Sequence, residues 1–175
     1  MAYTTIKKPS DYFNTKLWTG NGSSQNITGL NFQPDFVWIK DRDDTSSHAI
    51  TDAVRGNTKY LMSNGNYAEE TLTDRITSFN SDGYSLGSSG GVNQNGAGNV
   101  GWNWLANGAG SANTDGDIAS TVSANTTSGF SIVSYTGNST SGATVGHGLG
   151  AVPKMIILKN RSASEHWMVG TTSLG

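Results

Sequence analysis

The chain has 175 residues, of which 34% are hydrophobic and 14% charged, and it is rich in Gly, Ser, Thr and Asn. Eleven basic residues against thirteen acidic ones leave a net charge of −2, which excludes the Lys and Arg excess that nucleic-acid binding requires. The lack of cysteine excludes disulfides and thiolate metal sites, and the longest aliphatic run, Met155 to Leu158, is far too short to insert in a membrane.

The distribution of apolar residues favours an all-β fold. They form short dense runs bounded by turn residues, a pattern typical of strands rather than helices. Five Trp, six Tyr and five Phe, together with the low net charge, argue against a disordered chain. We therefore expect an antiparallel β-sandwich with long Gly/Ser/Asn loops. The clearest runs are 36–39, 100–105, 132–135 and 155–158.

The N-terminus is expected to form an arm rather than part of a core. Residues 1–12 are mostly polar and include Lys7, Lys8 and Pro9. They lack the apolar segment of a signal peptide, so we expect synthesis in the cytoplasm without secretion by the general route.

Residues 13–106 are expected to form a first β-sandwich unit. The run 36–39 carries large apolar side chains on both faces, which predicts an inner strand. Asp82 and Gly83 predict the turn of a hairpin. The segment 66–76 is the only place where the pattern allows a short helix. Residues 99–105 close the unit, with Trp102 and Trp104 on one face.

The chain then begins to repeat itself. Residues 107–129 are small and polar and are expected to be a linker. Residues 130–161 then repeat 13–42: a phenylalanine, a Thr-Gly-Asn turn, a Gly-Leu pair, a single proline, and a Lys and Arg two apart recur in order. Only fourteen residues follow Arg161, so residues 130–175 form an incomplete second unit. We expect further chain or neighbouring subunits to complete it.

Acidic residues do not predict an enzyme. Glu69 and Glu70 are the obvious candidates for a glycosidase pair, and Glu165 is the only other glutamate. Neighbouring residues of a strand point to opposite faces, whereas retaining chemistry needs two carboxyl groups about 5 Å apart. We expect no catalytic residues.

No metal or phosphate site is expected either, and no cofactor. Two acidic segments resemble the start of a calcium loop but lack its glycine and its bidentate glutamate, which leaves open only a looser calcium site. The three histidines are far apart and in no metal-type spacing. Residues 87–91 match the pattern G-x-S-x-G, and residues 146–150 are a glycine-rich loop, but a poor helix start follows the first and a strand the second. The residues concerned are Asp41, Asp43, Asp44, Asn113, Asp115, Asp117, His48, His147 and His166.

Aromatic residues provide the only candidate binding positions. Strand alternation predicts that Trp38 and Trp104 lie in a core. Tyr84, Tyr60 and Tyr67 are nearer to predicted loops, and these three tyrosines and Trp102 are the candidates for contacts with a glycan.

Several segments resemble a known family. FQPDFVWIK, AITDAVRG, TSFNSDGYSLGS, NVGWNWLANGAG, SGFSIVSYTGN and HGLGAVPKMIILKNR are similar to the repeated unit of phage virion proteins known as tail fibres or structural proteins, especially in marine and cyanobacterial phages. The resemblance extends from Tyr3 to Trp167. It implies a concanavalin A-like jelly-roll sandwich and supplies no catalytic residue.

The resemblance implies a function for the chain. We expect a non-enzymatic virion protein, a tail fibre or appendage subunit that forms a homo-oligomer, with a trimer favoured. Its partners are other virion proteins and a host-surface glycan. A soluble carbohydrate-binding module is the alternative, and a glycoside hydrolase that uses Glu69 and Glu70 is the third hypothesis.

Overall fold

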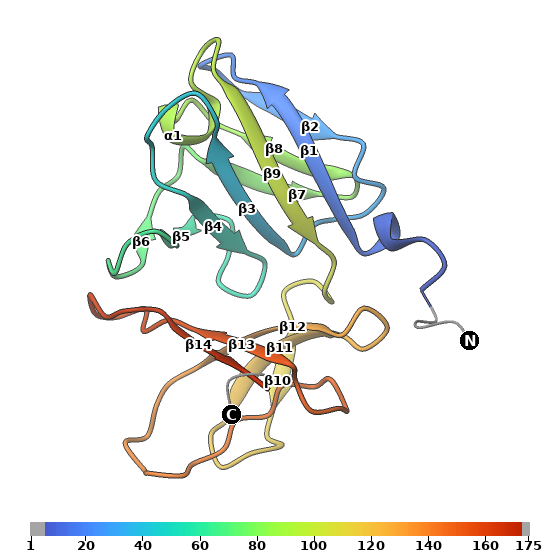
Figure 1. Ribbon diagram of the computed structural model, residues 1–175, viewed down its shortest axis with the longest axis vertical. Helices are drawn as coiled ribbons and strands as arrows, with labels where there is room; N and C mark the ends of the chain where they lie inside the picture. Colours follow the sequence, from blue (N-terminus) through green and yellow to red (C-terminus); the bar gives the residue numbers. More distant parts are fainter. Residues whose placement is uncertain (1–5, 173–175) are drawn as a thin grey trace.

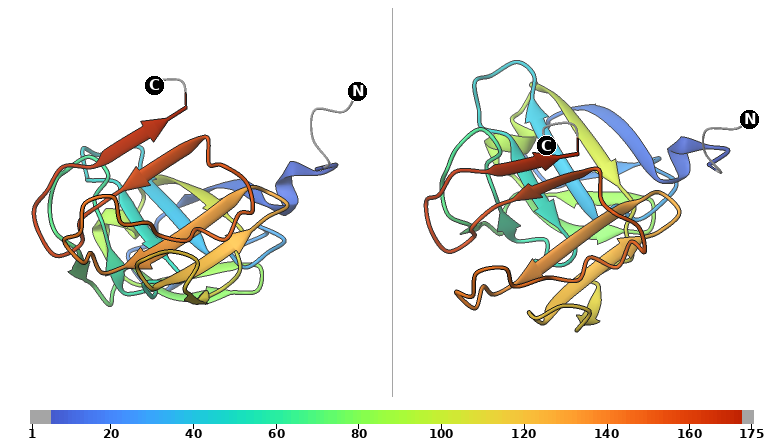
Figure 2. Two further views of the ribbon diagram at one scale, coloured as in Figure 1. Left: turned by 90° about the horizontal axis from the view of Figure 1, so that it is seen from below. Right: turned by 60° about the horizontal axis from the view of Figure 1, so that its bottom comes forward.

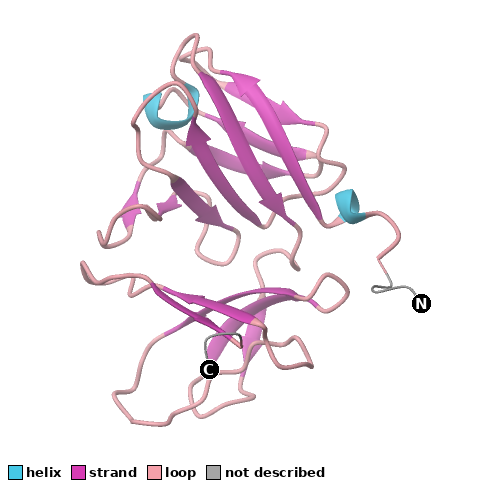
Figure 3. Ribbon diagram, viewed as in Figure 1, coloured by secondary structure: helices cyan, strands magenta, loops and turns pink. Residues whose placement is uncertain are grey.

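The computed structural model describes residues 6–172, which fold into an upper and a lower region of β-strands (Figures 1 and 3). This confirms the expected all-β fold. No helix of the described part is long and apolar enough to cross a membrane. The elements are the 3-10 helix Pro9–Asp11, β1 (Phe13–Thr19), β2 (Gln25–Thr28), β3 (Phe36–Asp41), β4 (Ala49–Asp52), β5 (Lys59–Tyr60), β6 (Glu70–Thr71), β7 (Ile76–Asn80), β8 (Gly83–Leu86), α1 (Gly90–Asn93), β9 (Gly98–Trp104), β10 (Ser111–Asn113), β11 (Ser120–Asn125), β12 (Phe130–Tyr135), β13 (Met155–Leu158) and β14 (Met168–Thr171).

The upper region is a sandwich of two antiparallel sheets. A four-stranded sheet has the order β1-β9-β3-β4, and a three-stranded sheet has the order β2-β8-β7. β5 and β6 form a small third sheet beside them. β3 is an inner strand, as its apolar residues predict. β9 lies between β1 and β3 and therefore joins the first strand of the unit to the third.

The hydrophobic core of the upper region lies between its two sheets. Both sheets contribute, because alternate strand residues point inward. The predicted hairpin β7–β8 is present; it turns at Ser81 and Asp82, one residue earlier than predicted, and the Asp82 carboxylate accepts the N–H groups of Gly29 and Asn31. The turn thereby ties the end of β2 to the hairpin. The buried core residues are Ile27, Leu30, Phe32, Val37, Ile39, Ala49, Tyr60, Ile76, Tyr84, Leu86 and Val92.

Strand alternation places the tryptophans on both faces of the four-stranded sheet. Trp18 points inward, where its ring meets Tyr84 edge-on at 6.2 Å. Trp102 and Trp104 share the outer face, as predicted. Trp38 lies opposite Trp102 on the same outer face, so the expectation that Trp38 and Trp104 belong to the core is wrong. Both side chains are half-buried there because other aromatic rings cover them.

Helical structure in the upper region differs from the prediction. Residues 66–76 contain no helix; they form β6, irregular chain and the first residue of β7. A short helix, α1, instead begins within the G-x-S-x-G segment, at Gly90, where only a hairpin loop was expected. Buried Asn93 explains this turn, because its side-chain amide donates to the carbonyl oxygens of Gly87 and Ser23. These two hydrogen bonds take the place of those that pairing in a strand would give the two carbonyl groups.

The lower region contains β10–β14. β10, β11 and β12 form one antiparallel sheet, and β13 and β14 form a separate hairpin. Residues 107–129 therefore do more than link the regions, since they supply β10 and β11. Figure 2 shows the β13–β14 hairpin in red beside the rest of the molecule.

The predicted repeat is present in the strand register. Each facing pair of β3–β4 has a counterpart at the same place in β13–β14, and the backbone N–H just after each hairpin donates to the residue just before it (Ala53 to Asp35, Thr172 to Lys154). The corresponding pairs are Phe36–Asp52 and Met155–Thr171, Val37–Thr51 and Ile156–Gly170, Trp38–Ile50 and Ile157–Val169, and Ile39–Ala49 and Leu158–Met168.

The loops of the two hairpins also share their hydrogen bonds. The Lys40 ammonium donates to the carbonyl of the next residue and to that of the residue four positions on. Lys159 makes the same two hydrogen bonds in the second hairpin. The side-chain oxygens of Asp41 and Asn160, which follow the lysines, each accept the N–H two residues later. The two hairpins thus share the same hydrogen bonds within their loops.

The copies differ in burial. Val37 and Ile39 of β3 are 0% and 1% exposed, whereas their counterparts Ile156 and Leu158 are 48% and 43% exposed. In β3 these side chains face a core that is closed by β9 and the opposing sheet. Neither layer has a counterpart on β13 within residues 6–172.

Candidate functional site

An aromatic cluster joins the two regions on the outer face of the four-stranded sheet. Phe13, Trp104 and Phe36 lie side by side on β1, β9 and β3. Phe130 of β12 stacks on Trp104 at 5.9 Å, with 21° between the ring planes, and meets Phe36 edge-on at 5.8 Å. The first residue of the second copy is therefore packed against the first copy's sheet.

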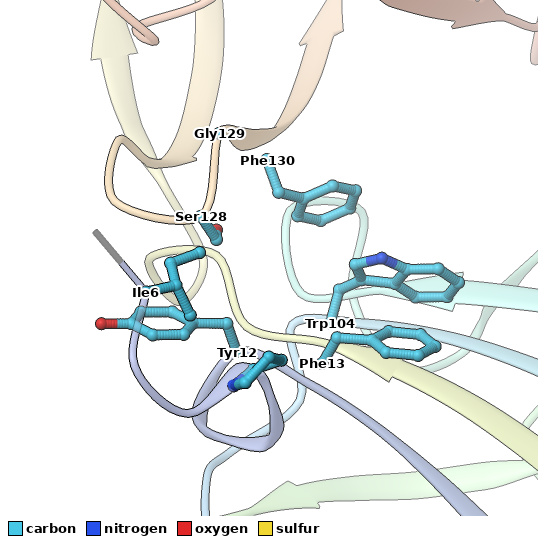
Figure 4. A pocket seen from close by; sticks show the side chains of 8 residues that line it. Ile6, Tyr12, Phe13, Trp104, Ser128, Gly129 and Phe130 are labelled. Atoms are coloured by element: carbon cyan, nitrogen blue, oxygen red, sulfur yellow. The ribbon is translucent and has the colours of Figure 1, made fainter. Parts of the chain in front are cut away.

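A pocket of about 330 Å³ opens beside this cluster (Figure 4). In the figure, Ile6 and Tyr12 lie on one side of the hollow, and the rings of Trp104, Phe13 and Phe130 lie on the other. Pro9, Ser128 and Gly129 complete the lining. Residues 6–12 of the expected arm thus form one wall of the pocket, while residues 1–5 lie outside the described part of the chain. The aromatic rings offer flat apolar faces to any ligand.

A second aromatic row lies further along the same sheet face. Trp102 and Trp38 meet edge-on at 6.1 Å, and the indole N–H of Trp38 donates to Nδ1 of His48 at 2.8 Å. Burial lowers the pKa of His48, and the positive charge of Lys40 lowers it further. The neutral imidazole is the form that can accept the Trp38 hydrogen bond. Trp102, a candidate glycan contact, is half-buried in this row.

Two of the three candidate tyrosines are in the core. Tyr84 and Tyr60 are fully buried, so they are not glycan contacts. Burial raises the pKa of both phenols, and the Tyr84 hydroxyl, beneath β9, has no hydrogen-bond partner within residues 6–172. The Tyr60 hydroxyl donates to the carbonyl of His48 at 3.3 Å. Their aromatic bodies point inward because both residues occupy inward positions of short strands, which proximity to loops did not reveal.

Tyr67 is the one candidate tyrosine on the surface. Its side chain is 56% exposed and packs beside Gly65, in the loop before β6. No other aromatic ring stacks on it in the described chain. It is therefore separated from the aromatic cluster and from the Trp102 row.

The candidate acid Glu69 is part of a buried ion-pair network. Arg55 binds Asp52 at 2.5 Å and Glu69 at 3.0 Å, and all three side chains are buried. Arg161 of the second copy contacts the same Glu69 oxygen at 3.2 Å. One carboxylate oxygen of Glu69 thus contacts two guanidinium groups, one from each copy.

The other two glutamates lie outside this ion-pair network. Glu70 is exposed on β6, where it pairs with Tyr60, and Glu165 is exposed in the loop before β14. Glu69 thus lies in the buried network, whereas the next residue, Glu70, lies on the surface.

The acidic segments accept hydrogen bonds from other groups of the chain. Asp43 accepts the N–H of Gly98 at 2.7 Å, and Asp44 accepts that of Ser46 at 3.1 Å. In the second segment, the Thr144 hydroxyl and N–H donate to Asp117 and lower its pKa. No group of three His, Asp or Glu side chains in residues 6–172 is placed to hold a metal ion. His147 accepts the N–H of Leu149 through Nδ1, and His166 is exposed.

Sequence reasoning missed the contacts that join the two regions. Phe130 and Arg161 were recognised as repeated residues, but not as the ones that touch the first unit. Trp167, another such residue, donates its indole N–H to the carbonyls of Met62 and Gly65. Trp167 stands where the first copy has His48, and this break in the repeat was the available signal.

Comparison with known proteins gives one result. The family model described as Domain of unknown function (DUF7483) matches residues 8–175. No curated protein and no solved structure matches the chain.

Proposed function

We propose that this chain, which belongs to the DUF7483 family, is a non-enzymatic structural protein of a phage virion, a subunit of a tail fibre or another appendage. The observation that carries the proposal is the second hairpin, which copies the first in register and loop while its apolar residues remain exposed. Copied units that cannot bury their own apolar faces are typical of extended assemblies. The resemblance to phage virion units directs the proposal to a virion.

The chemistry of the surface supports an assembly role. The exposed apolar side chains are concentrated on β13 and β14, and a contiguous exposed apolar patch marks a contact surface. Glu69, the most obvious acid, is held by Arg55 and Arg161 and serves the junction between the regions. We propose a homo-oligomer, with a trimer favoured, as the form in which the subunit assembles with other virion proteins.

Immunogold labelling of particles from the encoding phage tests the location. An antibody against residues 6–172 should decorate the tail, a fibre or another appendage of intact virions. Particles that carry no label, combined with label only in the soluble lysate, would contradict the proposal. Size-exclusion chromatography with light scattering tests the oligomer separately, and a strict monomer at all concentrations would contradict that part.

A second function, glycan binding, is favoured by the aromatic pocket beside Trp104. Tyr12, Phe13 and Phe130 supply further ring faces around the same hollow, and sugars bind such faces by stacking. This function can accompany the structural role in an appendage that contacts a host surface.

A glycan array tests the second function. Tyr12→Ala should abolish binding to any glycan that the chain retains, because Tyr12 lines the pocket. Tyr67→Ala removes an equally large ring outside the pocket and is the matched control. Trp102→Ala tests the neighbouring Trp102 row separately from the pocket. Equal binding by all variants would show that neither aromatic surface is a glycan site.

A further inference from the structure

The space beside β13 corresponds to the position that β9 fills in the first unit. β9 pairs with β1 along one edge and with β3 along the other. The repeats of β1 and β3 are β12 and β13. Within residues 6–172, β12 ends its sheet and β13 ends its hairpin, so each has an edge without a strand partner.

The first unit specifies the chemistry of the strand in this position. β9 is uncharged, and its inward residues are Asn99, Gly101 and Asn103. They are small enough for the sheet to approach the core, and the Asn103 amide donates to the carbonyl of Asn14 on β1. The outward residues are aromatic at Trp102 and Trp104. The vacant position thus calls for an extended, uncharged segment of similar length.

One residue that differs between the two copies changes the side chain that the segment should carry at its C-terminal end. In the first unit, the carboxylate of Asp35 accepts the N–H of Ala106, just after β9, at 2.8 Å. Lys154 stands at the place of Asp35 in the second copy and cannot accept a hydrogen bond. A segment antiparallel to β13 brings its C-terminal end to Lys154. A carboxylate there would complement the lysine.

We propose that the free edge of β13, together with β12, is a docking site for an extended segment of a partner polypeptide that resembles β9 and carries a carboxylate just after the strand. The segment adds a strand by backbone pairing and covers Ile156 and Leu158, which are exposed although their counterparts are buried. This inference rests on the proposed structural role and names the chemistry by which the module is extended.

A peptide-binding experiment on the whole chain tests the proposal. The probes are a fluorescently labelled peptide of residues 97–106, AGNVGWNWLA, and the same peptide with Ala106→Glu. We expect both to bind with an increase in anisotropy, and the glutamate peptide to bind about two- to fivefold more tightly, as for an exposed ion pair. A peptide with Gly101→Pro is the matched control, because proline removes a donor from the ladder, and it should not bind.

Variants of the chain locate the bound peptide. Ile156→Asp combined with Leu158→Asp should weaken binding about tenfold or more, because it places two charges under the added strand. Both side chains are exposed, so the folded chain tolerates the changes. Val152→Asp changes an exposed apolar residue outside the strand and should leave binding unaltered. Bound peptide should also slow amide hydrogen exchange in β12 and β13.

Each remaining outcome decides the proposal. Failure of both peptides to bind would overturn it. Self-association that is lost with Ile156→Asp, without peptide binding, would also overturn it and assign the edge to a second copy. Equal affinity of the two peptides would overturn the role given to Lys154. Virions that are labelled although no peptide binds would leave the structural role standing and reject the docking site alone.

Discussion

The hairpins β3–β4 and β13–β14 have the same register and the same loop hydrogen bonds, yet only the first is buried. The lysine at the end of each first strand and the Asp or Asn after it make the same hydrogen bonds within each loop. Burial depends instead on β9 and on the opposing sheet. The comparison shows that the hairpin is specified locally and its core is supplied from distant parts of the sequence.

The largest expected effect comes from truncating one side chain at the same position of both copies. Ile39→Ala should lower the free energy of unfolding by about 4 kcal/mol, because it opens a cavity in the core. Leu158→Ala, its counterpart, should change it by less than about 0.5 kcal/mol, as for an exposed position. Urea unfolding followed by tryptophan fluorescence measures both. Equal losses would mean that β13 is buried in solution.

The next effect concerns the ion-pair network around Glu69. Arg55→Met should lower the free energy of unfolding by about 3 kcal/mol, because it leaves the buried carboxylates of Asp52 and Glu69 without their shared partner. Arg161→Met removes a partly exposed arginine from the same Glu69 and should lower it by less than about 1 kcal/mol. Similar losses in the two variants would contradict the assignment of Arg55 as the centre of the network.

A smaller change in the free energy of unfolding, of opposite sign, is expected in the core of the upper region. Tyr84→Phe should raise the free energy of unfolding by about 1 kcal/mol, because the tyrosine hydroxyl is buried without a partner in the described part of the chain. Tyr60→Phe is the control: its hydroxyl donates to the His48 carbonyl, so its loss should lower the free energy by about 1 kcal/mol. Thermal unfolding of both variants measures the difference. A less stable Tyr84→Phe protein would reveal a partner for that hydroxyl.

The smallest effect is a pH dependence confined to the first hairpin. Because burial lowers the pKa of His48 below its ordinary value of 6.5, the unfolded chain takes up a proton more readily than the folded chain. Stability should therefore fall as the pH drops below about 6.5 towards the lower pKa of the folded state. His48→Asn keeps an acceptor for Trp38 and should remove this part of the pH dependence. Trp167, the counterpart of His48, does not titrate. The protection of β13–β14 against amide exchange should therefore not show this pH dependence.

The fold class could be read from short-range patterns. The run 36–39 predicted an inner strand, and Asp82 with Gly83 predicted a turn, because each signal depends on neighbouring residues alone. The helix α1 was missed because the buried amide of Asn93, which fixes it, bonds to Ser23, far away in sequence. Strands β10 and β11 were missed because small polar residues hide their alternation.

The candidate site was harder to predict, because exposure depends on what lies across the sheet. Tyr84 and Tyr60 are near loops in the sequence but point into the core, whereas Trp38 and Trp104 belong to clear strands but face outward. Alternation assigns residues to two faces without saying which face is covered. The cover for Trp104 comes from Phe130 of the other region, which no local pattern indicates.

The loop held by the Lys40 hydrogen bonds also has a consequence for the order in which the chain folds. β3 and β4 pair across this short loop, whereas β9 reaches β1 across 89 residues of sequence, as the bond from Asn103 to Asn14 shows. Short hairpins close in microseconds, and distant pairings are slower because the entropy of a long loop must be lost first. Each hairpin is therefore expected to form early during synthesis. It then serves as a preformed template on which the later strand is laid.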